Sequence, residues 1–262
     1  LGAVYYGTLS DSSDGKSTIF TTVPESDLQF TITGKWDESA SAFTQSCTIQ
    51  YSDGSSQSVE YNKKGLIQGS SDIELTPYGE ELARDTRDGF EKDQIHFQRI
   101  YSSPYKRAVR TAEIIAEKQE ADVQVDMRIR EMCFGKYEGE KIKAVKEVDE
   151  NIANCFHHPS LYMADETADS FQDLYDRIAA FLKDEVVPME QDPSIENILV
   201  VCHGAVIRAF LTYLRKMPLD EFWSIHQPNC CVNRIRLENG IFTIEKENIL
   251  YYDDPELLHR GV

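Results

Sequence analysis

The feature that most constrains the fold is an apolar run at residues 197–202, which leads directly into His203-Gly204 and a helical pattern at 205–216. A continuous apolar run is typical of a strand that is buried on both faces of a parallel sheet. Residues 94–101 followed by 105–119 repeat the order of strand and helix. The sequence therefore predicts an α/β fold with a mixed, largely parallel sheet that is flanked by helices.

Local signals place further elements in this part of the chain. Thr76-Pro77 predicts the start of a helix, because Thr caps helices and Pro fits the first turn. Residues 170–187 have the apolar spacing of an amphipathic helix. Two alternating segments, 233–237 and 241–245, flank Asn239-Gly240, which predicts a hairpin.

The first 60 residues have a different character. They are rich in Ser, Thr, Gly and Asp, alternate with period two, and contain the turn signals Asp14-Gly15 and Asp53-Gly54, so they predict hairpins. We divide the chain into a small all-β segment, residues 1–60, and an α/β domain, residues 61–262. Gly34-Lys35-Trp36 together with residues 47–54 resembles MORN-type repeats, although an unrelated β-meander fits equally well.

Composition excludes several classes of function. The chain has 27 Lys and Arg against 45 Asp and Glu, a net charge of −18, so it lacks the basic surface that binding to nucleic acid requires. No stretch approaches the roughly 20 apolar residues of a membrane span. The six cysteines lie mainly in apolar segments, which slightly favours a reducing compartment such as the cytoplasm. Because the sequence starts with Leu1 instead of Met, a removed leader stays an open alternative.

No cofactor or metal is expected from the motifs. The segment Cys155-Phe156-His157-His158 lacks the second pair of ligands that a closed zinc site needs. A P-loop is also missing from the sequence.

Three polar residues carry the candidate chemistry. Arg107 lies in the first turn of a predicted helix, where the dipole and the guanidinium both favour a phosphate oxygen. His203 follows the apolar strand, and an unperturbed imidazole can carry a proton near neutral pH. Glu131, in the loop after residues 123–125, is a candidate general acid for a leaving oxygen. Each of the three also has an ordinary interpretation: a solvated helix charge, a capping histidine and a loop carboxylate.

The order of these residues and of their neighbours resembles the histidine phosphatase superfamily, in its phosphoglycerate-mutase-like branch. The matching residues are Tyr61-Asn62, Gln68-Gly69, Asp72, Leu75-Thr76, Gly79, Ser102-Ser103-Pro104, Arg107, Thr111-Ala112, Arg130-Glu131, Phe134-Gly135, Glu138-Gly139 and residues 200–204.

The resemblance implies phosphoryl transfer to a histidine and assigns roles to five residues. Arg107 corresponds to the family's second phosphate-binding arginine, His203 to its second histidine and Glu131 to its acid. Asn62 and Gln68 would line the phosphate site. The implied ligand is a phosphorylated small molecule or an inorganic anion.

The chain departs from the family pattern at the nucleophile. The family's Arg-His-Gly motif would fall at Ser55-Ser56-Gln57, and no histidine precedes His96. Neither serine replaces an imidazole unless a nearby base activates it. The sequence therefore favours a catalytically impaired member of the family that keeps part of the phosphate-binding site.

Three alternatives stay open at this stage. Residues 16–22 resemble the family's first strand, in which case the β-rich segment is an insertion that replaced the catalytic loop. A second alternative is an active phosphomonoesterase or mutase whose nucleophile lies upstream of Leu1. The third is an interaction scaffold that binds a protein partner through residues 1–60. The substrate loop implied by the resemblance, residues 141–166, shows no pattern that identifies a substrate.

Overall fold

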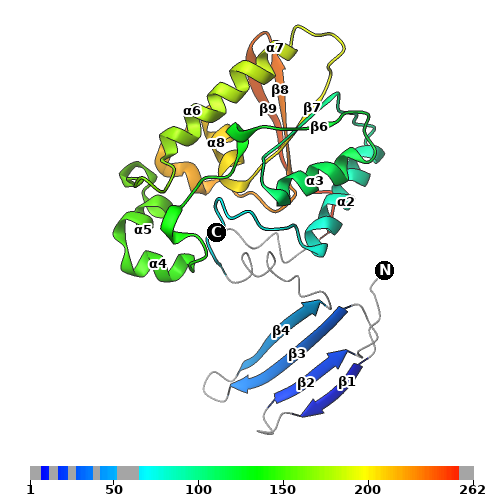
Figure 1. Ribbon diagram of the computed structural model, residues 1–262, viewed down its shortest axis with the longest axis vertical. Coiled ribbons are helices and arrows are strands. Elements are labelled where there is room, and N and C mark those ends of the chain that lie inside the picture. Colours follow the sequence, from blue (N-terminus) through cyan, green and yellow to red (C-terminus); the bar gives the residue numbers. More distant parts are fainter. Residues whose placement is uncertain (1–6, 12–16, 23–27, 38–41, 52–64, 254–262) are drawn as a thin grey trace. The chain divides into compact units, whose positions relative to one another are not determined.

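A computed structural model describes residues 7–11, 17–22, 28–37, 42–51 and 65–253. The chain divides into two units, Leu1–Gln57 and Ser58–Val262, coloured along the sequence in Figure 1. The division lies within a few residues of the predicted boundary at residue 60. That the two units fold as independent domains stays a prediction.

The first unit contains a four-stranded antiparallel sheet in the order β1-β2-β3-β4. Its strands are β1 (Gly7–Asp11), β2 (Ser17–Thr22), β3 (Leu28–Asp37) and β4 (Ala42–Tyr51). The predicted hairpin between β1 and β2 is therefore confirmed, whereas Asp53-Gly54 lies outside the described residues. The MORN resemblance and the binding of a protein partner by this segment stay predictions.

Strand β2 corrects one of the alternatives. It pairs antiparallel with β1 on one side and with β3 on the other. Both edges of β2 are therefore occupied within the first unit, and residues 17–22 do not form a strand of the parallel sheet. The interpretation of this segment as the first strand of the α/β domain is wrong.

The second unit is built on a parallel sheet in the order β6-β5-β7. Its strands are β5 (Arg99–Ser102), β6 (Val123–Val125) and β7 (Ile198–Val201). Ile100 in the middle strand pairs with Val123 on one side and with Leu199 on the other. The predicted α/β class with a largely parallel sheet is confirmed, and the carboxyl ends of all three strands point to the same edge.

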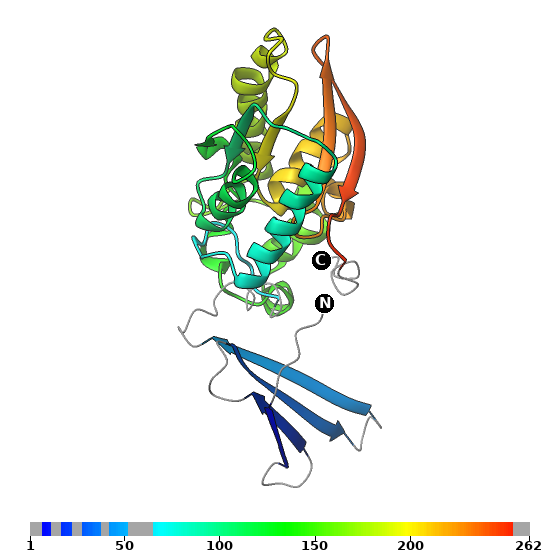
Figure 2. The same cartoon turned by 90° about the vertical axis from the view of Figure 1, so that its right-hand side faces the viewer.

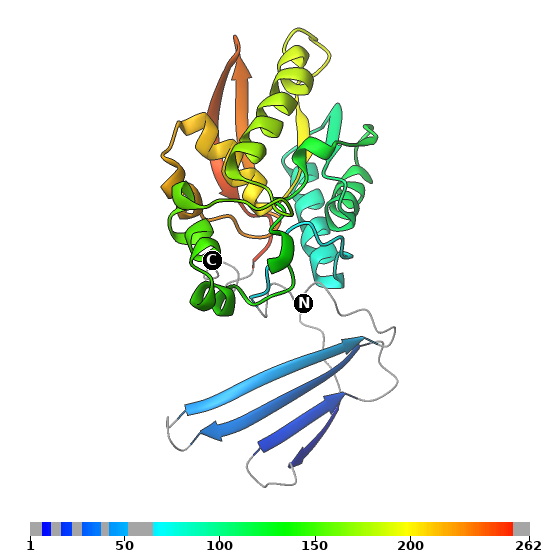
Figure 3. The ribbon, with the colours of Figure 1, turned by 60° about the vertical axis from the view of Figure 1, so that its left-hand side comes forward.

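Helices cover both faces of this sheet (Figures 1 and 3). Helices α2 (Pro77–Lys92) and α3 (Lys106–Ala116) contribute to one apolar cluster, and helices α6 (Phe171–Phe181) and α8 (Gly204–Arg215) contribute to the other. The side chains of β7 alternate between the two clusters: Ile198 and Val200 pack on the α6 and α8 side, and Leu199 and Val201 on the α2 and α3 side.

Strand β7 differs from the prediction in its burial. All four of its residues are only half-buried, although the apolar run predicts burial on both faces. Among the described residues, β5 is its only hydrogen-bonded neighbour in the sheet. No described strand pairs with the edge of β7 away from β5, and this agrees with the partial exposure of its residues.

The structure confirms one predicted helix start and shifts the boundaries of two other elements. The Thr76 side chain accepts a hydrogen bond from the backbone N–H of Gly79 at 3.0 Å, as expected for an N-cap. Strand β5 begins at Arg99, five residues later than predicted, and Gln94 at the end of α2 adopts a positive φ of 58°. The predicted helix at 170–187 ends as an α-helix at Phe181 and continues as a π-turn, Leu182–Val186, before α7 (Val187–Met189).

The remaining elements complete the second unit. The predicted hairpin is confirmed by β8 (Val232–Glu238) and β9 (Ile241–Ile249), with positive φ at Asn239 and Gly240 (Figure 2). Helices α4 (Ile142–Val148) and α5 (Glu150–His157) lie at the opposite end of this unit from α7 (Figures 1 and 3). Short 3₁₀ turns are Met127–Ile129, Gly135–Tyr137, Pro159–Leu161 and Leu219–Ser224. Within the described ranges, none of the helices has the length and apolar character needed to cross a bilayer.

Candidate active site

The candidate site lies where β5 and β7 end. Strand β5 leads into Ser103 and helix α3, and β7 leads into His203 and helix α8. Gln68, Arg107, Glu131 and His203 line one cavity at this edge. The structure therefore brings together four of the five residues that the sequence predicted, whereas Asn62 lies outside the described residues.

Arg107 is held in place by the loop that precedes α2. Its side chain is buried, and its two terminal nitrogens donate to the carbonyl oxygens of Ser71 at 2.6 Å and Gly69 at 2.9 Å. The guanidinium also lies over the ring of Tyr105, 5.1 Å from its centroid. Burial lowers the pKa of Arg107, but an arginine stays protonated at any ordinary pH. Arg107 therefore places a fixed positive charge in the cavity.

Glu131 is oriented by two backbone N–H groups. Oε1 accepts from Met132 at 2.9 Å, and Oε2 accepts from Ala205, in the first turn of α8, at 3.2 Å. Burial raises the pKa of Glu131, although these N–H groups and the charge of Arg107 act in the opposite direction. A raised pKa is what a carboxyl group needs to carry a proton near neutral pH and to donate it.

His203 is a buried imidazole. Burial, together with the charges of Arg107 and Arg177, holds the pKa of His203 well below its usual range. Its Nε2 lies 2.7 Å from Oγ of Ser103. The pair has the spacing of an activated serine, but Ser103 is fully buried and does not line the cavity. Ser103 therefore positions the imidazole and does not present a nucleophile.

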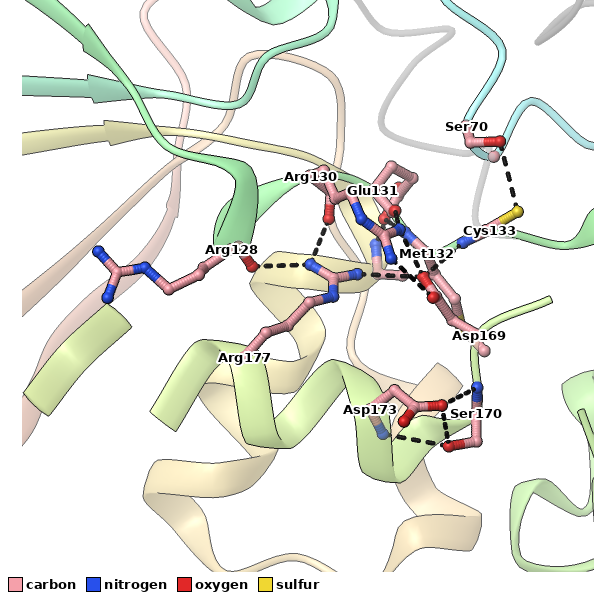
Figure 4. A network of polar contacts seen from close by, with 12 residues as sticks. Ser70, Arg128, Arg130, Glu131, Met132, Cys133, Asp169, Ser170, Asp173 and Arg177 are labelled. Atoms are coloured by element: carbon pink, nitrogen blue, oxygen red, sulfur yellow. Dashed lines mark hydrogen bonds and ion pairs between the residues drawn. The ribbon is translucent and has the colours of Figure 1, made fainter. Parts of the chain in front are cut away.

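A network of charged residues that the sequence did not predict supports the Glu131 segment (Figure 4). Arg130 and Asp169 form a two-pronged ion pair, with distances of 2.7 and 2.8 Å. Asp169 also accepts from the N–H of Cys133 at 2.9 Å. Arg177 donates to the carbonyl oxygens of Arg128 at 2.8 Å and of Arg130 at 2.5 Å. These bonds hold both flanks of Glu131, so they fix where its carboxyl group points.

Glu138 organises the loop on which Arg107 rests. Its carboxylate accepts from the N–H of Ser70 at 2.7 Å and from that of Phe134 at 3.0 Å. The hydroxyl groups of Ser70 and Ser71 donate to it as well, at 2.9 and 3.2 Å. The matched motif contained Glu138, but its position in the sequence gave no indication of this role.

Arg208 is a second buried cation, which the sequence motifs did not predict. It lines the cavity, and its Nε donates to the carbonyl of Ile225 at 2.9 Å while Nη1 donates to that of Gly204 at 3.1 Å. Its position four residues after Gly204, between the apolar residues Ile207 and Ala209, was the available signal.

The chain segment expected to contact a substrate, residues 141–166, forms α4, α5 and a 3₁₀ turn. His157 and His158 are exposed in this segment. Cys155 is buried, and its carbonyl accepts from the indole N–H of Trp223 at 2.7 Å. Within the part of the chain that the structure describes, no group of three or more His, Cys, Asp or Glu residues is arranged to hold a metal ion.

Comparison with known proteins gives a match over most of this unit. Residues 58–250 match the family described as the histidine phosphatase superfamily, branch 1. "Putative phosphoserine phosphatase 2" of Hydrogenobacter thermophilus is 32% identical over 197 residues, which cover 73% of this chain and 89% of that protein. "Probable phosphoglycerate mutase GpmB" of Escherichia coli O1:K1 is 27% identical over 184 residues, which cover 70% and 83% of the two proteins.

Solved structures show the same similarity. The structure of a phosphoserine phosphatase from Entamoeba histolytica in complex with 3-phosphoglyceric acid is similar to this chain, with a TM-score of 0.63 and 27% sequence identity. The similarity covers 72% of this chain and 91% of the Entamoeba chain. YhfR of Bacillus stearothermophilus has a TM-score of 0.63 and 26% identity, with 71% and 90% of the two chains covered.

Proposed function

Because the chain belongs to the histidine phosphatase superfamily, branch 1, we propose that its α/β unit binds phosphate or a phosphate monoester with little or no turnover. One observation supports this proposal above the others: Arg107, Glu131 and His203 line one cavity, whereas no histidine precedes His96 in the sequence. The binding groups are assembled, and the imidazole that would take the phosphoryl group is not among them.

The three residues would act on a bound phosphate in different ways. Arg107 supplies a permanent charge that faces the anion. His203, whose pKa is lowered by burial, would gain a proton when a dianion approaches, because a negative neighbour favours the charged imidazolium. Glu131 would stand near an ester oxygen with its proton in place. Binding is therefore expected to be coupled to proton uptake.

The size of the catalytic defect follows from what is missing. Loss of one group that stabilises a transition state costs about a hundredfold to a thousandfold in turnover. Loss of the nucleophile costs about a millionfold in a serine-protease benchmark. Glu131 and His203 cannot replace the missing nucleophile and arginine, since both residues would act on a phosphoryl group that a nucleophile has already begun to attack.

Calorimetric titration of the full chain with phosphate and with vanadate tests the binding. We expect saturable binding that is weakened at least tenfold, or about 1.4 kcal/mol, in Arg107→Gln. Arg110→Gln is the matched control, because Arg110 lies one turn later on α3 and bonds to Glu80 at 2.7 Å, outside the cavity. Titration in two buffers of different ionisation enthalpy measures the proton uptake. Absence of binding, or equal weakening by both variants, contradicts the proposal.

A hydrolysis assay with nitrophenyl phosphate tests the catalytic part. We expect no turnover that depends on His203. Rapid hydrolysis that His203→Ala abolishes would show an active phosphatase and overturn the assignment as an impaired member.

A second candidate function is an active phosphomonoesterase or phosphoglycerate-mutase-like enzyme whose nucleophile lies upstream of Leu1. The orientation of Glu131 by two backbone N–H groups, one in the first turn of α8, favours it, since a fixed carboxyl group suits protonation of a leaving oxygen. The relatives named phosphoserine phosphatase and phosphoglycerate mutase are consistent with such a reaction. Reading the gene upstream of the codon for Leu1 distinguishes the two, because an Arg-His-Gly motif there would supply the nucleophile.

A further inference from the structure

Apolar side chains from four separate segments of the chain line the same cavity as Arg107 and Glu131. They come from the loop before α2, the loop after Glu131, the segment of α4 and α5, and the 3₁₀ turn after α8. We call this set the apolar wall, and its residues are Leu66, Phe134, Ile142, Phe156 and Trp223. No role in binding phosphate itself follows for these side chains, because none of them is charged.

One end of the apolar wall packs against the loop that holds Arg107. A Cβ atom on Gly69 would lie 3.0 Å from Cδ2 of Phe134, so this ring contacts the backbone of Gly69. The carbonyl oxygen of the same residue accepts a hydrogen bond from Arg107 at 2.9 Å. Phe134 is therefore separated by a single residue from the guanidinium that would face the phosphate.

The aromatic rings of the apolar wall contact one another in series. Phe156 lies nearly parallel to Phe134, with an interplanar angle of 11° and ring centroids 5.8 Å apart. The Trp223 ring lies 5.3 Å from that of Phe156. The three rings therefore form one continuous apolar cluster, although they come from three different segments of the chain.

The other end of the apolar wall reaches the residues that hold Glu131. The Arg208 guanidinium lies over the ring of Trp223, 5.3 Å from its centroid, and donates to the carbonyl of Gly204 at 3.1 Å. The next residue, Ala205, donates its N–H to Oε2 of Glu131 at 3.2 Å. The wall therefore connects the backbone supports of the phosphate-binding arginine and of the acid.

This position places the apolar wall beside the organic group of a bound phosphate ester. Glu131 would stand near the ester oxygen, and the organic group is bonded to that same oxygen. The carbon atoms of the ester therefore lie on the Glu131 side of the phosphate, next to the wall. Burial of apolar surface against such side chains favours binding. The wall thus affects which ester the site accepts.

The apolar wall offers no partner to a polar organic group. Its only side chain with a hydrogen-bonding group is Trp223, and the indole N–H already donates to the carbonyl of Cys155 at 2.7 Å. The hydroxyl groups of a sugar or a polyol would lose their bonds to water there without replacing them, which costs free energy. Esters of sugars and polyols therefore fit the wall poorly.

Positive charges beside the apolar wall disfavour a cationic organic group. The ammonium of Lys146 lies over the Phe156 ring, 4.6 Å from its centroid, as the guanidinium of Arg208 lies over that of Trp223. The two rings thus already attract cations of the protein itself. An ammonium group on the ligand would meet two like charges. A neutral aromatic ring meets neither obstacle, and contacts between aromatic rings favour it further.

Given the proposed phosphate site, on which this inference rests, we propose that the ligand is the phosphate monoester of an aromatic alcohol. Its phosphate contacts Arg107, and its ester oxygen lies near Glu131. Its ring lies against Phe134, Phe156 and Trp223. The apolar wall then decides which ester binds, whereas Arg107 supplies the affinity that all phosphate esters share.

Calorimetric titration of the full chain with phosphonates tests the inference. In a phosphonate the phosphorus is bonded to carbon, so hydrolysis does not disturb the titration, and benzylphosphonate differs from methylphosphonate by one phenyl ring. We expect benzylphosphonate to bind at least about tenfold more tightly, because the wall buries the ring. Aminoethylphosphonate, which carries an ammonium group, should bind no more tightly than methylphosphonate. The inference is overturned if the benzyl and methyl compounds bind equally or if the aminoethyl compound binds most tightly.

Variants of the apolar wall locate the bound ring. Phe156→Ala removes a half-buried ring, and Ile142→Asn makes the wall polar at a second half-buried position. We expect each variant to reduce the ratio of the benzyl and methyl affinities at least about threefold, while methylphosphonate binds as it does to the wild type. If circular dichroism shows that one variant does not fold, the other decides.

Tyr162→Ala is the matched control for these variants. Tyr162 is a half-buried aromatic residue of the same segment, 141–166, and does not line the cavity. We expect the ratio of the two affinities to stay unchanged in this variant. A ratio that is unchanged in the wall variants, or that falls equally in the control, contradicts the position assigned to the ring.

Arg107→Gln separates a failure of this inference from a failure of the proposed phosphate site. We expect it to weaken both phosphonates by the same factor, since both carry the same charged group. Benzylphosphonate binding that persists in Arg107→Gln overturns the inference, because the ring then binds away from the phosphate site. Binding that depends on Arg107 but has equal affinities for the benzyl and methyl compounds overturns the inference alone. If neither phosphate nor any phosphonate binds, both proposals are wrong.

Discussion

The ion pair of Arg130 with Asp169 gives the sharpest test of how the Glu131 segment is held. In Asp169→Asn the side chain keeps its shape but loses the charge that faces Arg130 and Arg177. The side chain of Arg130 is 25% exposed, that of Asp169 is 12% exposed and that of Arg177 is 13% exposed. Breaking a buried pair from one side costs about 3–5 kcal/mol. Because Arg130 keeps some contact with water, we expect a loss of about 2–3 kcal/mol.

The loss is measurable by urea denaturation followed through the helical circular dichroism signal. The described helices all lie in Ser58–Val262, so this signal reports on the α/β unit. A loss of 2–3 kcal/mol corresponds to a decrease of about 5–10 °C in the melting temperature of a domain of this size. Asp176→Asn is the matched control, since Asp176 is exposed on the same segment of chain and its removal changes the net charge equally.

The pH dependence of the difference gives an independent check. Burial raises the pKa of Asp169, but the hydrogen bonds from Arg130 and Cys133 and the nearby charges outweigh it, so the pKa is lowered from its ordinary 3.8. The stabilisation by the carboxylate is therefore fully present above pH 3.8 and is lost as the pH falls through the folded-state pKa. A variant whose unfolding free energy at pH 7 lies within about 0.5 kcal/mol of the wild type, as for ordinary surface changes, would refute the reasoning.

Three other predictions follow from the site. Because the pKa of His203 is lowered in the folded protein, the unfolded chain binds the proton more readily. The free energy of unfolding should therefore fall by up to about 1.4 kcal/mol per pH unit below pH 6.5. Denaturation curves of His203→Gln should show a smaller decline. Glu138→Gln should cost about 1–2 kcal/mol and weaken phosphate binding in calorimetry, whereas the exposed Glu140→Gln should do neither. Gly69→Ala should destabilise more than Gly65→Ala in thermal melts, although both have positive φ, because only at Gly69 does a Cβ come within 2.2 Å of Glu138.

The sequence predicted the site residues whose position depends on local structure. Arg107 and His203 follow strands directly, so the strand and helix patterns sufficed to place them at one edge of the sheet. Arg130, Asp169 and Arg177 were not predicted, because Arg130 lies 39 residues from Asp169 and 47 from Arg177. No periodic pattern relates side chains over such distances.

The exposure of β7 illustrates the same limit for the fold. The apolar run correctly predicted a strand and its place in a parallel sheet. Burial of a strand also depends on what lies on each side of it, and the sequence of β7 contains no information about its neighbour. Both faces of β7 pack against apolar clusters, as predicted, but its four residues are only half-buried.

The pairing of β5 also has a consequence for how the protein is made. Ile100 contacts Val123 early in the chain, but its other partner, Leu199, is translated long afterwards. The sheet of the nascent polypeptide therefore lacks β7 while residues 124–199 are synthesised, at about 5–20 residues per second. During that interval Ile100 and its neighbours are exposed to chaperones and to other emerging chains, so the yield of native protein should depend on how fast translation proceeds between these two strands.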